Sequence, residues 1–475
     1  MSSFSSFSKS FCFGIAAISA LLGGNRQALA LEDDPPGAYQ APAPDPSPVE
    51  TLMLEYINRC RANPAEDGVR CSASSFPDVD MKMFLQEMSA EHPAPPLVFD
   101  LRILKAARWH CHYQIVNGQG HAEEEGKEGF TGVSPSDRVK RASFPGLVAE
   151  NAFVGPKDPW SCHSSFVVDF GKGPGGMQPG RGHRRNILNP DHRLAGVGAV
   201  PYDGDKRFAC THNFSGASER FAGGVVINDR NKNHFYDMGE GVPGVALSAG
   251  GESLKSWFSG AYTLPIPSTN AKLTVELEGK KYSVLLPDGK ENVKFDVLVN
   301  EKQNFHAAAG LLASIKKLPP GDAGDSRRLA AEIDLYFVSQ STLVEDELLD
   351  EIQAITGPVR EKVNKDMEDA RKAVADAEVS DARQLARGLS QKYSRTRARS
   401  WFADALVTVE IRDGYQSLAS LKGDGKAVTP AMVGRILKKQ QGLFQQLTSP
   451  EWKKIALDWV TKTNSMSGAT PEAEK

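Results

Sequence analysis

GRGHRRNILNPDHRLAGVGAV, residues 180–200, is the stretch of this sequence that decides the fold. His183 stands in a turn rich in glycine and arginine, ahead of a run of small and β-branched residues. Upstream, His121 follows a Gly-Gln-Gly turn, and Glu150 lies beside an apolar run, where a buried carboxylate needs a partner. Two imidazoles and a carboxylate within the length of one domain have the composition of a polar cleft able to hold a metal ion.

The segments around this stretch alternate between helical and strand patterns. Four helices are expected, over residues 49–64, 100–116, 134–144 and 160–170. Asn63-Pro64 is expected to stop the first of them. Residues 192–204 and 206–216 alternate like the two strands of a β-hairpin. This mixture predicts an α+β domain over residues 50–218.

Four segments of this domain resemble the CAP superfamily of cysteine-rich secretory, antigen-5 and pathogenesis-related proteins, especially its bacterial SCP-like members. They are LVFDLRILKAARWHCHYQ (97–114), GHAEEEGKEGFTGVSPSDRVKRASF (120–144), AEN (149–151) and the opening stretch. The resemblance implies an α-β-α sandwich whose cleft carries two histidines and two glutamates. By position it assigns His121, Glu150 and His183 to this cleft. Asp169 stands near the place of the second glutamate and is a weak candidate for it.

Three interpretations of this cleft are open from the residues. His121 and His183 are candidate zinc ligands, and the same groups are suited to general-base chemistry without a metal. The third interpretation is a hydrogen-bonded polar cluster that orders a binding site. No nucleophile motif is present, and Asp169 is shorter than glutamate, so non-catalytic binding is favoured over hydrolysis. His110 adjoins an apolar helix face and is expected to be structural.

A second site is expected within GGVVINDRNKNHFYDMGEGVPGVALS, residues 223–248. Its oxygen donors stand at positions 1, 3, 5, 7, 9 and 12 of a calcium loop: Asp229, Asn231, Asn233, the Phe235 carbonyl, Asp237 and Glu240. His234 occupies position 6, where a left-handed turn favours glycine. The alternative is a turn rich in Asn and Asp that holds no ion.

The flanks of this loop are strand-like, and short β-branched runs broken by Gly, Pro and Asn continue after it. They predict a small all-β sandwich over residues 222–302. The string from Gly223 to Leu247 resembles the start of a serine-aspartate-repeat B-type domain, a calcium-binding β-sandwich of bacterial surface proteins.

The remaining segments of the 475-residue chain complete a modular organisation. Residues 1–30 have the charge, apolar run and Ala-Leu-Ala site of a cleaved signal peptide, and the Pro-rich residues 31–49 predict a linker. Helical periodicity predicts an all-α domain over 303–465, followed by a disordered tail over 466–475. Trp401, Phe402, Phe444, Trp452 and Trp459 are expected in the core of the helical domain.

Composition limits the partners and the location. A net charge of −3 gives no basic field for nucleic acid, and no apolar segment after the signal peptide is long enough to span a membrane. Export permits disulfides, and Cys60 and Cys71 flank a short loop as the best candidate pair. The sequence therefore predicts a secreted or cell-surface protein, with a periplasmic location as the alternative. Its partner is expected to be an extracellular lipid, glycan or protein, or a surface component.

Overall fold

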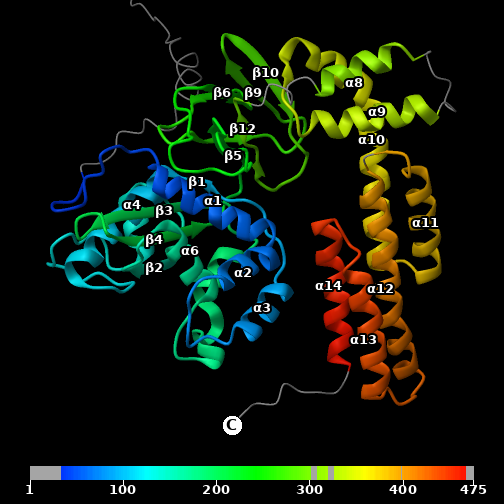
Figure 1. Cartoon of the computed structure of the whole chain (residues 1–475), viewed down its shortest axis with the longest axis horizontal. Helices are drawn as coiled ribbons and strands as arrows, with labels where there is room; N and C mark the ends of the chain where they lie inside the picture. Colours follow the sequence, from blue (N-terminus) through cyan, green and yellow to red (C-terminus); the bar gives the residue numbers. More distant parts are fainter. Residues whose placement is uncertain (1–33, 301–306, 319–325, 397, 467–475) are drawn as a thin grey trace, which may run out of the picture.

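The computed structural model describes residues 34–300, 307–318, 326–396 and 398–466. Figure 1 shows an α/β domain in blue to green, a β region in green and a helical region in yellow to red. The predicted signal peptide and all but Met466 of the predicted tail lie outside the described residues. Within the described residues, no helix is both long enough and apolar enough to cross a membrane.

The α/β domain is built on a four-stranded sheet with the order β1-β3-β4-β2. Its strands are β1 (Val98–Phe99), β2 (Ala149–Val154), β3 (Leu194–Tyr202) and β4 (Arg207–Ser215). The predicted hairpin is confirmed as β3 and β4, while β1 runs parallel to β3 and β2 antiparallel to β4. The end of the 180–200 stretch thus becomes a central strand.

Seven α-helices accompany this sheet. They are α1 (Pro48–Ala62), α2 (Pro64–Ser72), α3 (Met81–Ala90), α4 (Leu101–Asn117), α5 (Pro135–Arg141), α6 (Pro159–Val168) and α7 (Gly182–Leu188). Asn63 ends α1 as predicted, but its side chain also accepts from Glu66 N and caps α2, with Pro64 in the first turn. The chain therefore turns directly from one helix into the next.

Two glycines of the 180–200 stretch allow α4 to pack closely on β3. A Cβ on Gly196 would lie 2.2 Å from the carbonyl carbon of Ile103, and one on Gly198 would lie 2.8 Å from that of Ala107. Both neighbours are helix backbone, which cannot rotate away as a side chain can. The glycines are thus required by the approach of a helix to a strand.

The β region contains two sheets that share one apolar core. In one, β5 (Arg220–Ile227) pairs with β8 (Ala261–Ile266), β11 (Val293–Lys294) and β12 (Val297–Leu298). The other has the order β13-β10-β9-β6-β7, with β6 (Ala246–Ala249), β7 (Glu252–Lys255), β9 (Lys272–Leu277) and β10 (Lys280–Leu285). The outermost strand β13 (Val344–Glu345) comes from the segment predicted to be entirely helical. It adds to the open edge of β10, a pairing that helical periodicity does not reveal.

In the described parts of the helical region there are seven helices. They are α8 (Ala307–Lys316), α9 (Ser326–Ser339), α10 (Asp346–Asp376), α11 (Val379–Lys392), α12 (Arg399–Gly423), α13 (Pro430–Phe444) and α14 (Pro450–Ser465). Phe402 and Trp452 are fully buried in its core, and Trp401, Phe444 and Trp459 pack against that core while partly buried. The expectation for these aromatic side chains is therefore confirmed.

The predicted linker is corrected by the structure. Residues 34–47 lack helix and strand, as expected, but they pack on α4. Arg108 donates from its guanidinium to the carbonyls of Ala43, Pro44 and Asp45, and Lys105 forms an ion pair with Asp34. The N–H donors of the buried Arg108 side chain need hydrogen-bond acceptors. An extended Pro-rich segment provides them, because its carbonyls are not used in a helix or sheet.

The β region docks on the α/β domain through polar contacts and aromatic packing. Lys294 Nζ lies 2.9 Å from Glu55 Oε2 on α1 and also pairs with Asp296. Asn292 Nδ2 donates to the carbonyls of Pro96 and Arg193. Because these groups come from both parts, the β region is held against the domain by more than the chain connection.

Candidate functional site

The turn of α7 pairs His183 with Asp169. The His183 Nδ1 donates to Asp169 Oδ1 at 2.8 Å, and the His183 backbone N–H donates to Oδ2 at 3.0 Å. Asp169 is fully buried and caps the end of α6 in a left-handed conformation, with φ of 57°. The aspartate therefore fixes both the ring and the main chain of His183.

The other polar residues of the 180–200 stretch hold this turn in place. Arg184 is buried and donates to the carbonyls of Val167 and Val168 at the end of α6. Asn186 Nδ2 donates to the Glu150 carbonyl at 3.2 Å and to Asn151 Oδ1 at 2.9 Å. The motif thus connects α6, α7 and β2 around His183.

A second histidine–carboxylate pair lies on β2. His121 Nδ1 donates to Glu150 Oε1 at 3.0 Å, with the imidazole 57% exposed and the carboxylate side chain 2% exposed. The hydrogen bond to Glu150 raises the pKa of His121, partly offset by burial. Burial by itself raises the pKa of Glu150. The hydrogen bond from His121 and the charge of Arg138 lower this pKa by more, so the net shift is downward. Both shifts favour a charged pair.

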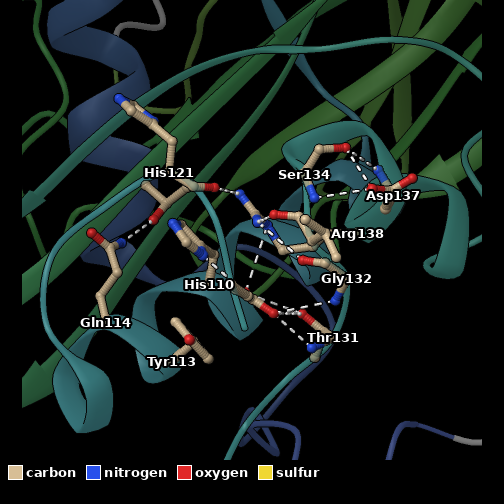
Figure 2. Close-up of polar contacts among 12 residues, drawn as sticks. His110, Tyr113, Gln114, His121, Thr131, Gly132, Ser134, Asp137 and Arg138 are labelled. Carbon is tan, nitrogen blue, oxygen red and sulfur yellow. Dashed lines mark hydrogen bonds and ion pairs between the residues drawn. The ribbon is translucent and has the colours of Figure 1, made fainter. Parts of the chain in front are cut away.

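Arg138 on α5 lies at the centre of the buried network behind this pair (Figure 2). Its Nη2 donates to Glu150 Oε2 at 2.7 Å and to the His121 carbonyl at 3.1 Å, and its Nε lies 3.7 Å from Glu123 Oε1. Glu123 also accepts from the backbone N–H groups of Thr131 and Gly132. This arginine therefore compensates two buried carboxylates at once.

His110 is structural, as the sequence predicts. It is fully buried, with Nδ1 donating to Glu123 Oε1 at 2.9 Å and Nε2 donating to the Gly120 carbonyl at 2.8 Å. These two contacts fix the ring of His110 between Glu123 and the loop at Gly120. Arg138 is the arginine that compensates the carboxylates of Glu123 and Glu150.

The predicted site residues form two neighbouring pairs and not one cluster. His121 belongs with Glu150, and His183 belongs with Asp169. The pairs are connected through Asn151, which follows Glu150 and donates to the His183 carbonyl at 3.0 Å. Among the described residues, no three of these four groups bring metal-ligating atoms within 4.8 Å of one another.

The comparison with protein families gave one match. Residues 54–214 match the family model described as CAP, the cysteine-rich secretory protein family. This segment is a CAP domain. The comparisons with curated proteins and with solved structures gave no match. The residues expected in the CAP cleft form two neighbouring pairs, His121 with Glu150 and His183 with Asp169; these four residues are called the CAP site below.

The chemistry of the CAP site is limited by how its carboxylates are occupied. Both oxygens of Glu150 and both oxygens of Asp169 accept hydrogen bonds from the groups described above. In the described part of the chain, the Nε2 atoms of His121 and His183 have no polar partner. A carboxylate behind Nδ1 is the arrangement that orients a metal-ligating imidazole, so each ring fits one zinc ligand position.

The calcium loop predicted at 229–240 closes on its own polar groups. Asp229 accepts from the backbone N–H groups of Asn233 and His234, while Asn231 and Asn233 donate to Asp237 Oδ2 at 2.7 and 2.9 Å. Glu240 Oε2 accepts from Asp237 N at 3.3 Å. Side-chain contacts thus join Asn231 and Asn233 to Asp237, whereas Asp229 and Glu240 bind backbone N–H groups of the loop. The ligand atoms of the three acids do not all lie within 4.8 Å of one another among the described residues.

His234 takes the left-handed turn at position 6, with φ of 56°. The conformation expected to need glycine is thus adopted by histidine. Phe235, proposed as a carbonyl ligand, stacks on Tyr56 of α1 with ring centroids 5.6 Å apart. The loop consequently contacts the CAP domain.

The predicted disulfide is not formed in the structure. Cys60 and Cys71 are free, buried thiols, and the Cys71 Sγ lies 3.8 Å from Asp67 Oδ2. Sequence spacing places the two cysteines near each other but does not show that a carboxylate lies beside them.

Two residues of the CAP site were missed by reasoning from the sequence alone: Glu123 and Arg138. Arg138 stands in the Pro-x-Asp-Arg string quoted for the family resemblance, and that string was the available signal. Glu123 is the first of three consecutive glutamates, which the sequence does not distinguish from a solvated acidic run. Only its buried contacts single it out.

Proposed function

We propose that the CAP domain is a non-catalytic binding module of an exported protein, which holds an extracellular lipid, glycan or protein through His121 and His183. The observation that carries this proposal is the occupied state of both carboxylates. Glu150 gives its two oxygens to His121 and Arg138, and Asp169 gives both of its oxygens to His183. Both acids are also buried and directed at protein donors, so neither faces solvent as a general base acting on water would.

The same arrangement supports ligand recognition. Each imidazole is oriented by a carboxylate on Nδ1, which leaves Nε2 for a ligand. When protonated, His121 presents an Nε2–H donor with positive charge, which suits an oxygen acceptor such as a glycan hydroxyl or a lipid headgroup. The raised pKa of His121 extends this state toward neutral pH.

Binding of the full chain to a glycan array and to vesicles of neutral and anionic lipid tests this proposal. We expect His121→Ala and His183→Ala each to weaken binding about tenfold or more, equivalent to about 1.4 kcal/mol or more. His92→Ala, outside both pairs, is the control and should bind like the wild type. Binding that is unchanged in both CAP-site variants would contradict the proposal.

A metal-dependent extracellular hydrolase, protease-like in character, is the second candidate. The unpartnered Nε2 atoms favour it, because His121 and His183 would hold zinc through them, with Glu150 and Asp169 orienting the rings. Zinc would supply a bound water of lowered pKa. Peptide hydrolysis by zinc-loaded protein that disappears in His183→Ala, with unchanged melting temperature, would favour this candidate over simple binding.

We further propose that the loop 229–240 binds calcium and stabilises the β region as a spacer or adhesion module. The loop has five oxygen-bearing side chains at calcium-loop spacing, three of which contact one another in the present structure, and calcium prefers such donors. A chelator is expected to lower the melting temperature of the wild type, because an ion that binds only the folded state stabilises it. Asp229→Ala should remove this response. A wild type that is insensitive to chelator would rule out the site.

A further inference from the structure

A second cluster of metal-ligating side chains lies in the interior of the CAP domain, apart from the two histidine–carboxylate pairs. Cys60 on α1, Asp67 on α2 and His163 on α6 bring one ligand atom each within 4.8 Å of one another. All three are buried, with exposures of 0%, 0% and 1%. Among the described residues, no other trio of His, Cys, Asp or Glu meets this criterion.

A fourth residue able to bind a metal lies next to the trio. Cys71, one turn after Asp67 on α2, points its Sγ at Asp67 Oδ2 from 3.8 Å and is also fully buried. His163 Nε2 lies 2.7 Å from the same oxygen. Cys71 therefore borders the trio through Asp67, while its Sγ does not belong to the group of ligand atoms that all lie within 4.8 Å of one another.

We propose that Cys60, Asp67, Cys71 and His163 form a structural zinc site. Sulfur, imidazole nitrogen and carboxylate oxygen are the donors that zinc takes, and four protein ligands complete its tetrahedral shell. Ligand atoms around tetrahedral zinc lie about 3.5 to 4 Å apart. The atoms of Cys60, Asp67 and His163 are already near this spacing, and the Cys71 side chain must turn toward them to supply the fourth ligand. With every ligand buried, no position is open for a reacting water, which is typical of structural sites.

The charges around the cluster balance when the ion is present. Arg59 Nε lies 2.9 Å from Asp67 Oδ1. This ion pair can stay in place while the other oxygen of Asp67 binds the metal. Two thiolates and Asp67 contribute three negative charges, and zinc with Arg59 contributes three positive charges. Zinc binding displaces the two thiol protons to solvent, so no oxidant or reductant takes part.

Aromatic side chains enclose the cluster. The rings of Tyr56 and Trp160 each lie 5.5 Å from the His163 ring, and the Arg59 guanidinium lies over both of them. This shell restricts water, which strengthens metal–ligand bonds and restricts exchange. Zinc here would connect α1, α2 and α6, and α6 ends at Asp169, the partner of His183.

Metal analysis of the full exported chain tests the inference. We expect about one zinc ion per chain to survive gel filtration, and cobalt substitution to give sulfur-to-cobalt charge-transfer bands with tetrahedral visible bands. Cys60→Ser, Cys71→Ser and His163→Gln should each lower the bound metal and the melting temperature. Cys111→Ser, a buried cysteine on α4, is the matched control and should keep the metal. His183→Ala should keep it as well, which separates this site from zinc in the CAP site.

Two results would overturn the inference. One is reduced wild-type protein that binds neither zinc nor cobalt at micromolar concentrations. The other is a Cys60–Cys71 disulfide peptide recovered in full yield from the exported protein. If the serine variants fail to fold, the cobalt spectrum of the wild type decides alone, because the absence of thiolate charge-transfer bands refutes the site.

Discussion

Replacing Arg138 with methionine should destabilise the CAP domain more than any other single change in the network around Glu150. The guanidinium is fully buried and lies 2.7 Å from Glu150 and 3.7 Å from Glu123. Methionine fills similar space but leaves the two buried carboxylates with histidines as their only ion-pair partners among the described residues. Removing one partner of a buried ion pair costs about 3 to 5 kcal/mol, so we expect a loss in that range.

Pulse proteolysis in urea measures this loss within the full chain, with peptides from residues 54–214 identified by mass spectrometry so that the CAP domain alone is followed. Arg141→Met changes an exposed arginine at the end of the same helix and should cost less than about 0.5 kcal/mol. Arg138→Met should also cost less in acid than at neutral pH, because protonated carboxyls need no cation.

The double variant Arg138→Met with Glu150→Gln gives the sharpest check of this reasoning. Since the glutamine removes one uncompensated charge, the double variant should be more stable than Arg138→Met alone. A loss below about 1 kcal/mol for Arg138→Met, or the same loss at both pH values, would refute the electrostatic account.

Two further predictions concern the packing of β3 and the titration of the CAP site. Gly196→Ala should destabilise the domain by about 1 to 3 kcal/mol in urea unfolding, because its Cβ would overlap the α4 backbone. Gly182→Ala is the control, because a Cβ at Gly182 would have no neighbour within 4 Å. Equal losses of stability in the two variants would contradict the packing argument. The His121 pKa should exceed 6.5 by NMR titration and return toward that value in Glu150→Gln. Its stabilising contribution is complete below pH 6.5 and is lost as pH rises through the raised folded value, so a wild-type midpoint at or below 6.5 would disprove the pairing.

The local structure of the CAP domain could be read from the sequence because its signals are local. Apolar spacing located α1 and α4, and the alternation after residue 192 located the β3–β4 hairpin. The motif with His183 also led to the family that the comparison supports. These features depend on neighbouring residues, whose side chains must match the period of a helix or strand.

The long-range contacts could not be read in this way. The strand β13 adds to a sheet edge from within a helical sequence, and residues 34–47 pack on α4 although their composition is that of a linker. In both cases the backbone groups of the segment form hydrogen bonds with a part of the chain that is distant in sequence: a strand edge for β13 and the Arg108 side chain for residues 34–47. Nothing in the sequence of either segment indicates which distant group will be its partner.

The sequence alone was enough to predict His121, Glu150 and His183 as residues of one candidate site, because they stand in recognisable motifs. Only the tertiary structure decided how they pair: each imidazole has its own carboxylate, and Asp169 serves His183 as the second acid. It also placed Arg138 between two buried glutamates. The physical reason is that periodicity reports which side of an element is buried, whereas the partner of a buried charge is set by elements that meet only when the chain is folded.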